Sequence, residues 1–89
     1  MDLGLKNKNI IVTGGTRGIG LAAAKACAAE GANLSICGRN QASLDSAKQE
    51  LAVYGTTVHG AMCDISDANQ IAAYINDALV ALGGLDGLV

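Results

Sequence analysis

A glycine-rich segment constrains the fold of this chain most strongly, because it joins a short β-branched run to an alanine-rich stretch. The run covers residues 10–12, the glycine-rich segment covers residues 14–20, and the stretch covers residues 19–30. The run is typical of a buried strand, and the stretch is typical of a helix that ends at Gly31. The first amides of a helix have no partners within it, and the helix dipole places partial positive charge there. Glycines let an anionic group approach those amides, so the segment predicts a strand–turn–helix unit with an anion-binding end.

The glycines of this segment have separate expected roles. Gly14 makes the sharp exit from the strand, Gly18 leaves room for a pyrophosphate, and Gly20 lets the helix lie close to the strand. A face of small residues is expected to continue along the helix through Ala22, Ala23, Ala26 and Cys27. A P-loop is excluded, because Leu21 follows Gly20 where that motif has a lysine. The alternative is a tight strand-to-helix connection that binds nothing.

Short apolar runs alternate with longer amphipathic stretches along the rest of the chain. Further strands are expected at residues 33–37, 58–62 and 85–89. The resulting order is β-α-β-α-β-α-β. Strands that alternate with helices through short turns predict an α/β fold with a parallel sheet and right-handed crossovers.

The second and third expected helices each show apolar residues at helical spacing. These residues are Leu44, Ala47, Leu51 and Tyr54 in the second helix, and Ile71, Ile75, Ala78 and Leu82 in the third. Asn40 and Ser66 are the expected N-caps, and Gly55 and Gly83 follow the expected helix ends.

Charge and cysteine content exclude several classes of function. Six basic and eight acidic side chains give a formal net charge of −2, which argues against a nucleic-acid partner. No apolar run approaches the ~18 residues that span a membrane, and residues 1–6 lack the layout of a signal peptide. The three cysteines, Cys27, Cys37 and Cys63, fit neither a disulfide framework nor a metal site. Reduced cysteines and no export signal predict a cytoplasmic protein.

Four segments in order resemble the short-chain dehydrogenase/reductase family. They are T-G-G-T-R-G-I-G at residues 13–20, C-G-R-N at 37–40, C-D-I-S-D at 63–67 and L-D-G-L-V at 85–89. Among members, the chain looks most like bacterial reductases of the 3-oxoacyl-carrier-protein-reductase type. The resemblance implies the N-terminal part of a Rossmann doubly wound sheet, with strands in the order 3-2-1-4. Residues 1–89 are then the NADP(H)-binding part of a truncated oxidoreductase that transfers hydride between a carbonyl and an alcohol.

The choice of dinucleotide depends on the residue that follows the second strand. NAD-binding sites of this kind place an acidic residue there to hold the ribose 2′-OH, but residues 36–40 contain none. Arg39 occupies that place, and a guanidinium pairs with a 2′-phosphate through two hydrogen bonds. Arg17 in the glycine-rich segment could face the same phosphate, so both residues favour NADP(H). The alternative is that each arginine is a solvated surface charge.

The resemblance also implies roles after the third strand and along the loop. Asp64 would hydrogen-bond the adenine amino group, with a backbone contact from Ile65. The complete set of implied cofactor-binding residues is Gly14, Thr16, Arg17, Gly18, Ile19, Gly20, Arg39, Asp64 and Ile65. A turn carboxylate or a helix cap is the alternative for Asp64, and Asp67 and Asp86 are expected to be surface or cap residues. His59, the single histidine, is expected at an edge or on the surface.

The family's catalytic Tyr-x-x-x-Lys pair is missing from these 89 residues. Tyr54 and Tyr74 are followed four positions later by Val58 and Ala78. No catalytic residue or metal site is therefore expected here, and the small-molecule carbonyl or alcohol substrate would belong to a full-length parent. The alternatives are a stand-alone module that binds NADP(H) or another adenine nucleotide, and a structural fragment. An uncovered sheet edge and apolar face would favour self-association.

Overall fold

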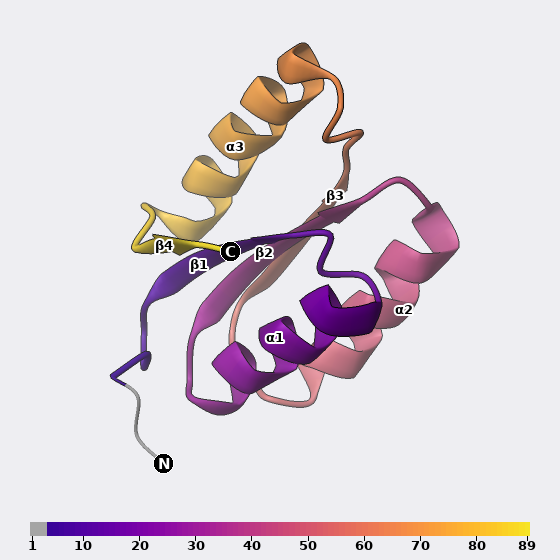
Figure 1. Ribbon diagram of the computed structural model, residues 1–89. Coiled ribbons are helices and arrows are strands. Elements are labelled where there is room, and N and C mark those ends of the chain that lie inside the picture. Colours follow the sequence, from indigo (N-terminus) through magenta and orange to yellow (C-terminus); the bar gives the residue numbers. More distant parts are fainter. Residues whose placement is uncertain (1–3) are drawn as a thin grey trace.

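The computed structural model describes residues 4–89, so residues 1–3 of the predicted 1–89 domain lie outside the described part. Four strands and three helices alternate along the chain, which confirms the predicted order (Figure 1). The strands are β1 (Asn9–Thr13), β2 (Asn33–Gly38), β3 (Val58–Met62) and β4 (Gly87–Leu88). The helices are α1 (Gly18–Ala29), α2 (Gln41–Ala52) and α3 (Ala68–Leu82).

The strands form one parallel sheet, as the alternation of strands and helices predicts, in the order β3-β2-β1-β4 that the family resemblance implies. Helices α1 and α2 cover one face of the sheet, and α3 covers the other face (Figure 1). The apolar residues divide accordingly. The core on the α1–α2 face is built around Leu34, Ile36 and Leu51, and the core on the α3 face around Ile11, Tyr74 and Ala78.

Two expected details of the helix ends are wrong. Asp67, not Ser66, is the N-cap of α3, because its carboxylate accepts the backbone N–H groups of Asn69 and Gln70. Helix α2 ends at Ala52, so Tyr54 lies beyond it and is exposed. The expected cap Asn40 is confirmed, since its side chain accepts the Ser43 amide at 3.0 Å.

The packing face of α1 also differs from the expected one. Ala24 and Ala28 are the buried residues of this helix, whereas Ala22 and Ala26 are exposed. The packed face therefore repeats every four residues from Gly20, which is the spacing of one helix face. Cys27 packs against the edge of this core, as expected.

A polar side-chain network ties together the amino ends of the strands. The Asn9 side chain donates to the Leu82 carbonyl at the end of α3 at 3.1 Å, and the Asn9 backbone N–H donates to Asp86 at 2.8 Å. The Asn33 side-chain amide donates from Nδ2 to the Asn9 side chain, and its Oδ1 accepts the Thr57 backbone N–H. Asp86 is exposed, as expected. Its hydrogen bond with Asn9 also holds the start of β1 beside β4.

Candidate cofactor-binding site

The glycine-rich loop at the carboxyl end of β1 adopts a conformation that most residues avoid. Gly14 and Gly18 have φ angles of +67° and +61°, in the left-handed region that favours glycine. A Cβ atom at either position would meet no other atom within 4 Å, so these glycines serve backbone conformation and leave open space beside the loop. The predicted sharp exit at Gly14 fits this geometry.

Gly20 allows a close approach of a different kind. A Cβ atom there would clash with the carbonyl oxygen of Gly14 and lie 2.9 Å from its carbonyl carbon. The first turn of α1 therefore packs directly on the backbone of the loop that precedes it, at Gly14 and Gly15. This contact fixes where the amino end of the helix lies relative to β1.

Arg17 is the N-cap residue of α1 and has extended backbone, with φ −165° and ψ 170°. Within residues 4–89 its side chain makes no capping hydrogen bond to the helix. The first amides of α1 consequently stay open to an anionic group, in the partial positive charge of the helix end. Ile19, in that first turn, is 91% exposed, so it presents its backbone and not a packed side chain.

A cavity of about 180 Å³ lies at the carboxyl ends of the strands. It brings together five predicted site residues, which are Gly14, Thr16, Arg17, Arg39 and Ile65. Gly18, Ile19 and Gly20 lie at the start of α1 beside it, and Asp64 lies next to Arg39 without lining it. The structure thus gathers the predicted residues of three separate chain segments around one opening.

Asp64 is held firmly from its own loop. Its carboxylate accepts the Ser66 hydroxyl at 2.6 Å and the Ser66 amide at 2.9 Å, and its backbone N–H donates to the Gln70 side chain at 2.9 Å. The Ser66 hydrogen bonds lower the pKa of the Asp64 carboxyl, and the nearby Arg39 guanidinium adds to this effect. Asp64 is therefore a charged acceptor at neutral pH.

Three further residues line the cavity, and the sequence did not single them out as site residues. Gly38 ends β2, and a Cβ atom there would lie 2.7 Å from the Thr16 methyl group, so the glycine lets the loop close over the strand end. Cys37 and Cys63 form part of the inner wall. A glycine at the end of a strand is the one sequence signal that could have pointed to Gly38.

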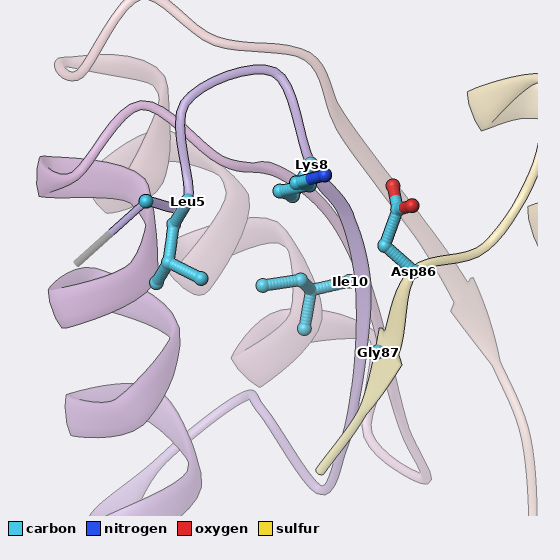
Figure 2. A pocket seen from close by; sticks show the side chains of 6 residues that line it. Leu5, Lys8, Ile10, Asp86 and Gly87 are labelled. Carbon is cyan, nitrogen blue, oxygen red and sulfur yellow. The ribbon is translucent and has the colours of Figure 1, made fainter.

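A larger cavity of about 280 Å³ lies at the opposite, amino ends of β1 and β4. Figure 2 shows Leu5 and Ile10 beside it, with Gly87 on β4 and the charged side chains of Lys8 and Asp86 at its rim. None of the predicted site residues lines this cavity. It is separate from the glycine-rich loop, whereas five of the predicted site residues line the cavity of about 180 Å³.

The smaller cavity fits the nucleotide half of a dinucleotide. Open helix amides suit a diphosphate, Gly14 and Gly18 leave space where other residues would carry a Cβ atom, and two guanidinium groups suit a third phosphate. Among residues 4–89, no group of three or more metal-binding side chains is found. None of the helices in this part of the chain has the length and apolar character that crossing a membrane requires.

Comparison with known proteins decides the family. The family described as short chain dehydrogenase matches residues 8–89, which is nearly the whole chain. The chain belongs to the short-chain dehydrogenase family. This confirms the resemblance that the four sequence segments carry.

Other members of the short-chain dehydrogenase family align along the whole chain. It is 46% identical over 89 residues to the "Uncharacterized oxidoreductase YvrD" of Bacillus subtilis, and covers 33% of that protein. It is 41% identical over 86 residues to the 3-oxoacyl-[acyl-carrier-protein] reductase FabG of Chlamydia muridarum; this aligns 96% of the chain with 35% of that reductase. The chain therefore spans about a third of the length of the curated relatives that it matches.

Solved structures agree with the fold. The L-sorbose reductase of Gluconobacter frateurii, solved with NADPH and L-sorbose, superposes with a TM-score of 0.93 at 31% identity, over 99% of this chain and 34% of the reductase. A xylitol dehydrogenase solved with bound NAD+ superposes with a TM-score of 0.91 at 25% identity, over 94% of this chain and 32% of that one. The Rossmann-type sheet in the order 3-2-1-4 is thus confirmed.

Proposed function

We propose that residues 1–89 are the NADP(H)-binding part of a short-chain oxidoreductase that interconverts a carbonyl and an alcohol. The observation that carries the proposal is the position of Arg39. It follows the carboxyl end of β2 and lines the same cavity as Arg17 and the glycine-rich loop. An acidic residue at that position would hold a ribose 2′-OH, whereas a guanidinium suits a 2′-phosphate.

The proposed contacts divide the cofactor among three chain segments. The loop around Gly14 and Thr16 and the open amides of residues 18–20 hold the diphosphate. Arg39 and Arg17 bind the 2′-phosphate from two sides. Asp64, kept charged by Ser66, accepts the adenine amino group, and Ile65 lies beside the ring. When bound, the nicotinamide supplies or accepts the hydride of the reaction.

The relatives support a nicotinamide cofactor without choosing between its two forms. Their solved structures include one described with NAD+ and one described with NADPH. The preference for NADP(H) in this chain therefore depends on its own residues, Arg39 and Arg17.

The complete reaction is proposed for a longer protein that contains this part. Neither Tyr54 nor Tyr74 has the lysine four positions later that the family's catalytic pair requires. We expect the 89-residue chain to bind NADP(H) without turning over a carbonyl or alcohol substrate. Its proposed location is the cytoplasm, which the three free cysteines support.

Titration calorimetry of the 89-residue chain with NADPH and with NADH tests the proposal. We expect NADPH to bind more tightly, and we expect no NADPH oxidation when a simple ketone is added. Equal affinity for the two cofactors would remove Arg39 and Arg17 from the site. If the chain bound neither NADPH nor NADH, the alternative of a structural fragment would be favoured.

We also propose that this chain associates with copies of itself through the β4 edge. β4 pairs with β1 alone among the described strands. Its residue Leu88 is 62% exposed, and the following Val89 is 59% exposed. An unpaired edge that carries apolar side chains is a template for pairing with another chain.

A further inference from the structure

Two buried cysteines meet behind the cofactor cavity. Cys37 is the next-to-last residue of β2, and Cys63 directly follows the end of β3. The two residues are 0% and 3% exposed. Both belong to the core on the α3 face, and both line the same two cavities. The cysteine spacing alone fits no disulfide framework, whereas the fold brings these two residues to the ends of neighbouring strands.

Two cavities border the pair. One is the candidate cofactor cavity, and the other is an apolar cavity of about 130 Å³ between the sheet and α3. Cys37 and Cys63 line both of them. The accessible surface of the pair belongs to Cys63, which is 3% exposed, so a small neutral molecule meets the pair at that residue.

We propose that Cys37 and Cys63 form a redox modification site, in which a peroxide oxidises the two thiols to a disulfide and thereby alters the cofactor cavity. The coupling to the cofactor rests on the proposed function, whereas formation of the disulfide does not.

The reaction balances with one molecule of peroxide. The Cys63 sulfur, which is the slightly more exposed of the two, attacks a peroxide oxygen; the O–O bond breaks and the thiol proton leaves with the departing oxygen. With hydrogen peroxide this gives a sulfenic acid at Cys63 and one water. The Cys37 sulfur then attacks the Cys63 sulfur, the S–S bond forms, and the sulfenic oxygen leaves as a second water. Two thiols have lost two electrons and two protons, and the peroxide has been reduced to water.

Sheet geometry explains why the disulfide would disturb the cavity. Cys37 is opposite Ala61 in the β2–β3 register, so Cys63 lies two residues farther along. In a regular parallel sheet that offset separates the Cα atoms by about 8 Å, whereas a disulfide needs a Cα separation below about 7 Å. The strand ends must therefore shift toward each other when the bond forms.

The residues that would move are those of the candidate site. The Cys63 backbone N–H donates to the Gly38 carbonyl at 2.9 Å, Arg39 follows Gly38, and Asp64 follows Cys63. A shift at either cysteine is transmitted directly to the side chains that are proposed to hold the adenosine. Oxidation is consequently expected to weaken cofactor binding.

The surroundings of the thiols set the rate of the reaction. Burial raises the pKa of the Cys63 thiol, and the neighbouring Cys37, Asp64 and Asp67 act in the same direction. From α3, the Tyr74 hydroxyl group also faces the pair. Because the thiolate is the nucleophile, oxidation is expected to be slow at pH 7 and faster as the pH rises.

The first test follows the disulfide itself. The 89-residue chain is treated with hydrogen peroxide at pH 7 and at pH 9, alkylated, and mapped by mass spectrometry without reduction. We expect a Cys37–Cys63 linkage that forms faster at pH 9. Cys27 is the internal control, because it lies on α1 across the sheet and is expected to remain alkylatable. A Cys27→Ser variant should form the linkage, and Cys37→Ser and Cys63→Ser variants should not. Linkages that involve Cys27, or sulfinic acid at unlinked cysteines, would overturn the proposal.

The second test follows the cofactor. NADPH affinity is measured for the reduced chain, the oxidised chain, and the oxidised chain after dithiothreitol. We expect affinity to fall about tenfold on oxidation and to return on reduction. An affinity that does not change while the linkage is present would overturn the coupling. Failure of the reduced chain to bind NADPH would instead contradict the proposed function. The mass-spectrometric mapping would still show whether the Cys37–Cys63 disulfide forms.

Discussion

The Arg39 guanidinium lies 3.9 Å from the Asp64 carboxylate, across the carboxyl ends of β2 and β3. An ion pair of this length, with a largely exposed arginine, contributes little stability and leaves the arginine free to turn toward a stronger partner. Asp64, in contrast, is fixed by Ser66 and Gln70. The end of the cavity that is proposed to hold the adenosine therefore combines a fixed acceptor, Asp64, with an exposed cation, Arg39, which suits recognition of an amino group and of a phosphate.

Substitution Arg39→Asp should weaken NADPH binding by about 10- to 100-fold, because ~1.5–3 kcal/mol of charged hydrogen bonding is lost. The new carboxylate would also lie near Asp64, and the preference for NADPH over NADH should narrow. Parallel calorimetric titrations of both cofactors measure the two effects. Lys25→Asp is the matched control, because it makes the same change of net charge at an exposed ion pair with Glu50, away from the cavity. A ratio of affinities that Arg39→Asp leaves unchanged would show that this side chain is a surface charge.

The depressed pKa of Asp64 predicts a loss of stability in acid. Because the pKa is lower in the folded chain than its ordinary value of 3.8, the Asp64 contribution is fully present above that value and is lost as the pH falls through the folded pKa. Asp64→Asn should therefore reduce the slope of stability against pH below about pH 4. Urea unfolding of both proteins at pH 3 and pH 7 measures this. Ser66→Ala should act in the same direction, and equal slopes in all three proteins would contradict the assigned cause.

Much of the fold could be predicted from local sequence features. The β-branched run before Gly14 indicates β1, and the glycine after α1 indicates where that helix ends. Both signals come from residues that are adjacent in the sequence. The strand order is not local, and it came from the family resemblance. The site residues were likewise predicted segment by segment, and the structure brings most of them to one cavity.

The features that were missed depend on contacts between distant segments. Thr16 lies against Gly38, Cys37 shares a core with Cys63, and Asn9 hydrogen-bonds to Leu82. The two residues of each pair come from different parts of the chain. The error at Ser66 has a different origin. Two residues of the same loop could cap α3, and the Ser66 hydroxyl is already donated to Asp64, which leaves Asp67 to accept the helix amides.

Substitution Gly20→Ala should destabilise the chain and weaken cofactor binding together. The added methyl group would collide with the Gly14 backbone, which cannot move without opening the loop. Overpacking of this kind costs about 1–3 kcal/mol. Thermal unfolding measures the first effect, and NADPH titration below the unfolding transition measures the second. Ala22→Ser, at an exposed position of the same helix, is the control and should change stability by less than about 0.5 kcal/mol.

Tyr74 should titrate far above an ordinary tyrosine. It is 4% exposed, and burial between α3 and the sheet raises its pKa to about 12, although the hydrogen bond between its oxygen and the Ser35 hydroxyl, at 2.6 Å, opposes the shift. The folded chain should therefore lose stability as the pH rises above 10, because the unfolded tyrosine ionises first. In a Tyr54→Phe background, the absorbance of phenolate at 295 nm reports Tyr74 alone. A midpoint near 10 in the folded state would contradict the burial of this side chain.

The exposed edge of the sheet should make the chain self-associate. The Leu88 side chain extends from β4 beside the apolar cavity under α3, next to Ile11 in the strand register. A lysine on an edge strand discourages pairing with another chain, so Leu88→Lys should shift the chain toward monomer. Sedimentation equilibrium over a hundredfold range of concentration measures the change. Val80→Lys is the matched control, because Val80 is 85% exposed on α3 and does not belong to the edge or the cavity. Equal molecular masses for the original chain and both variants would show that this edge is not an interface, whereas a loss of association in Val80→Lys alone would move the interface to the outer surface of α3.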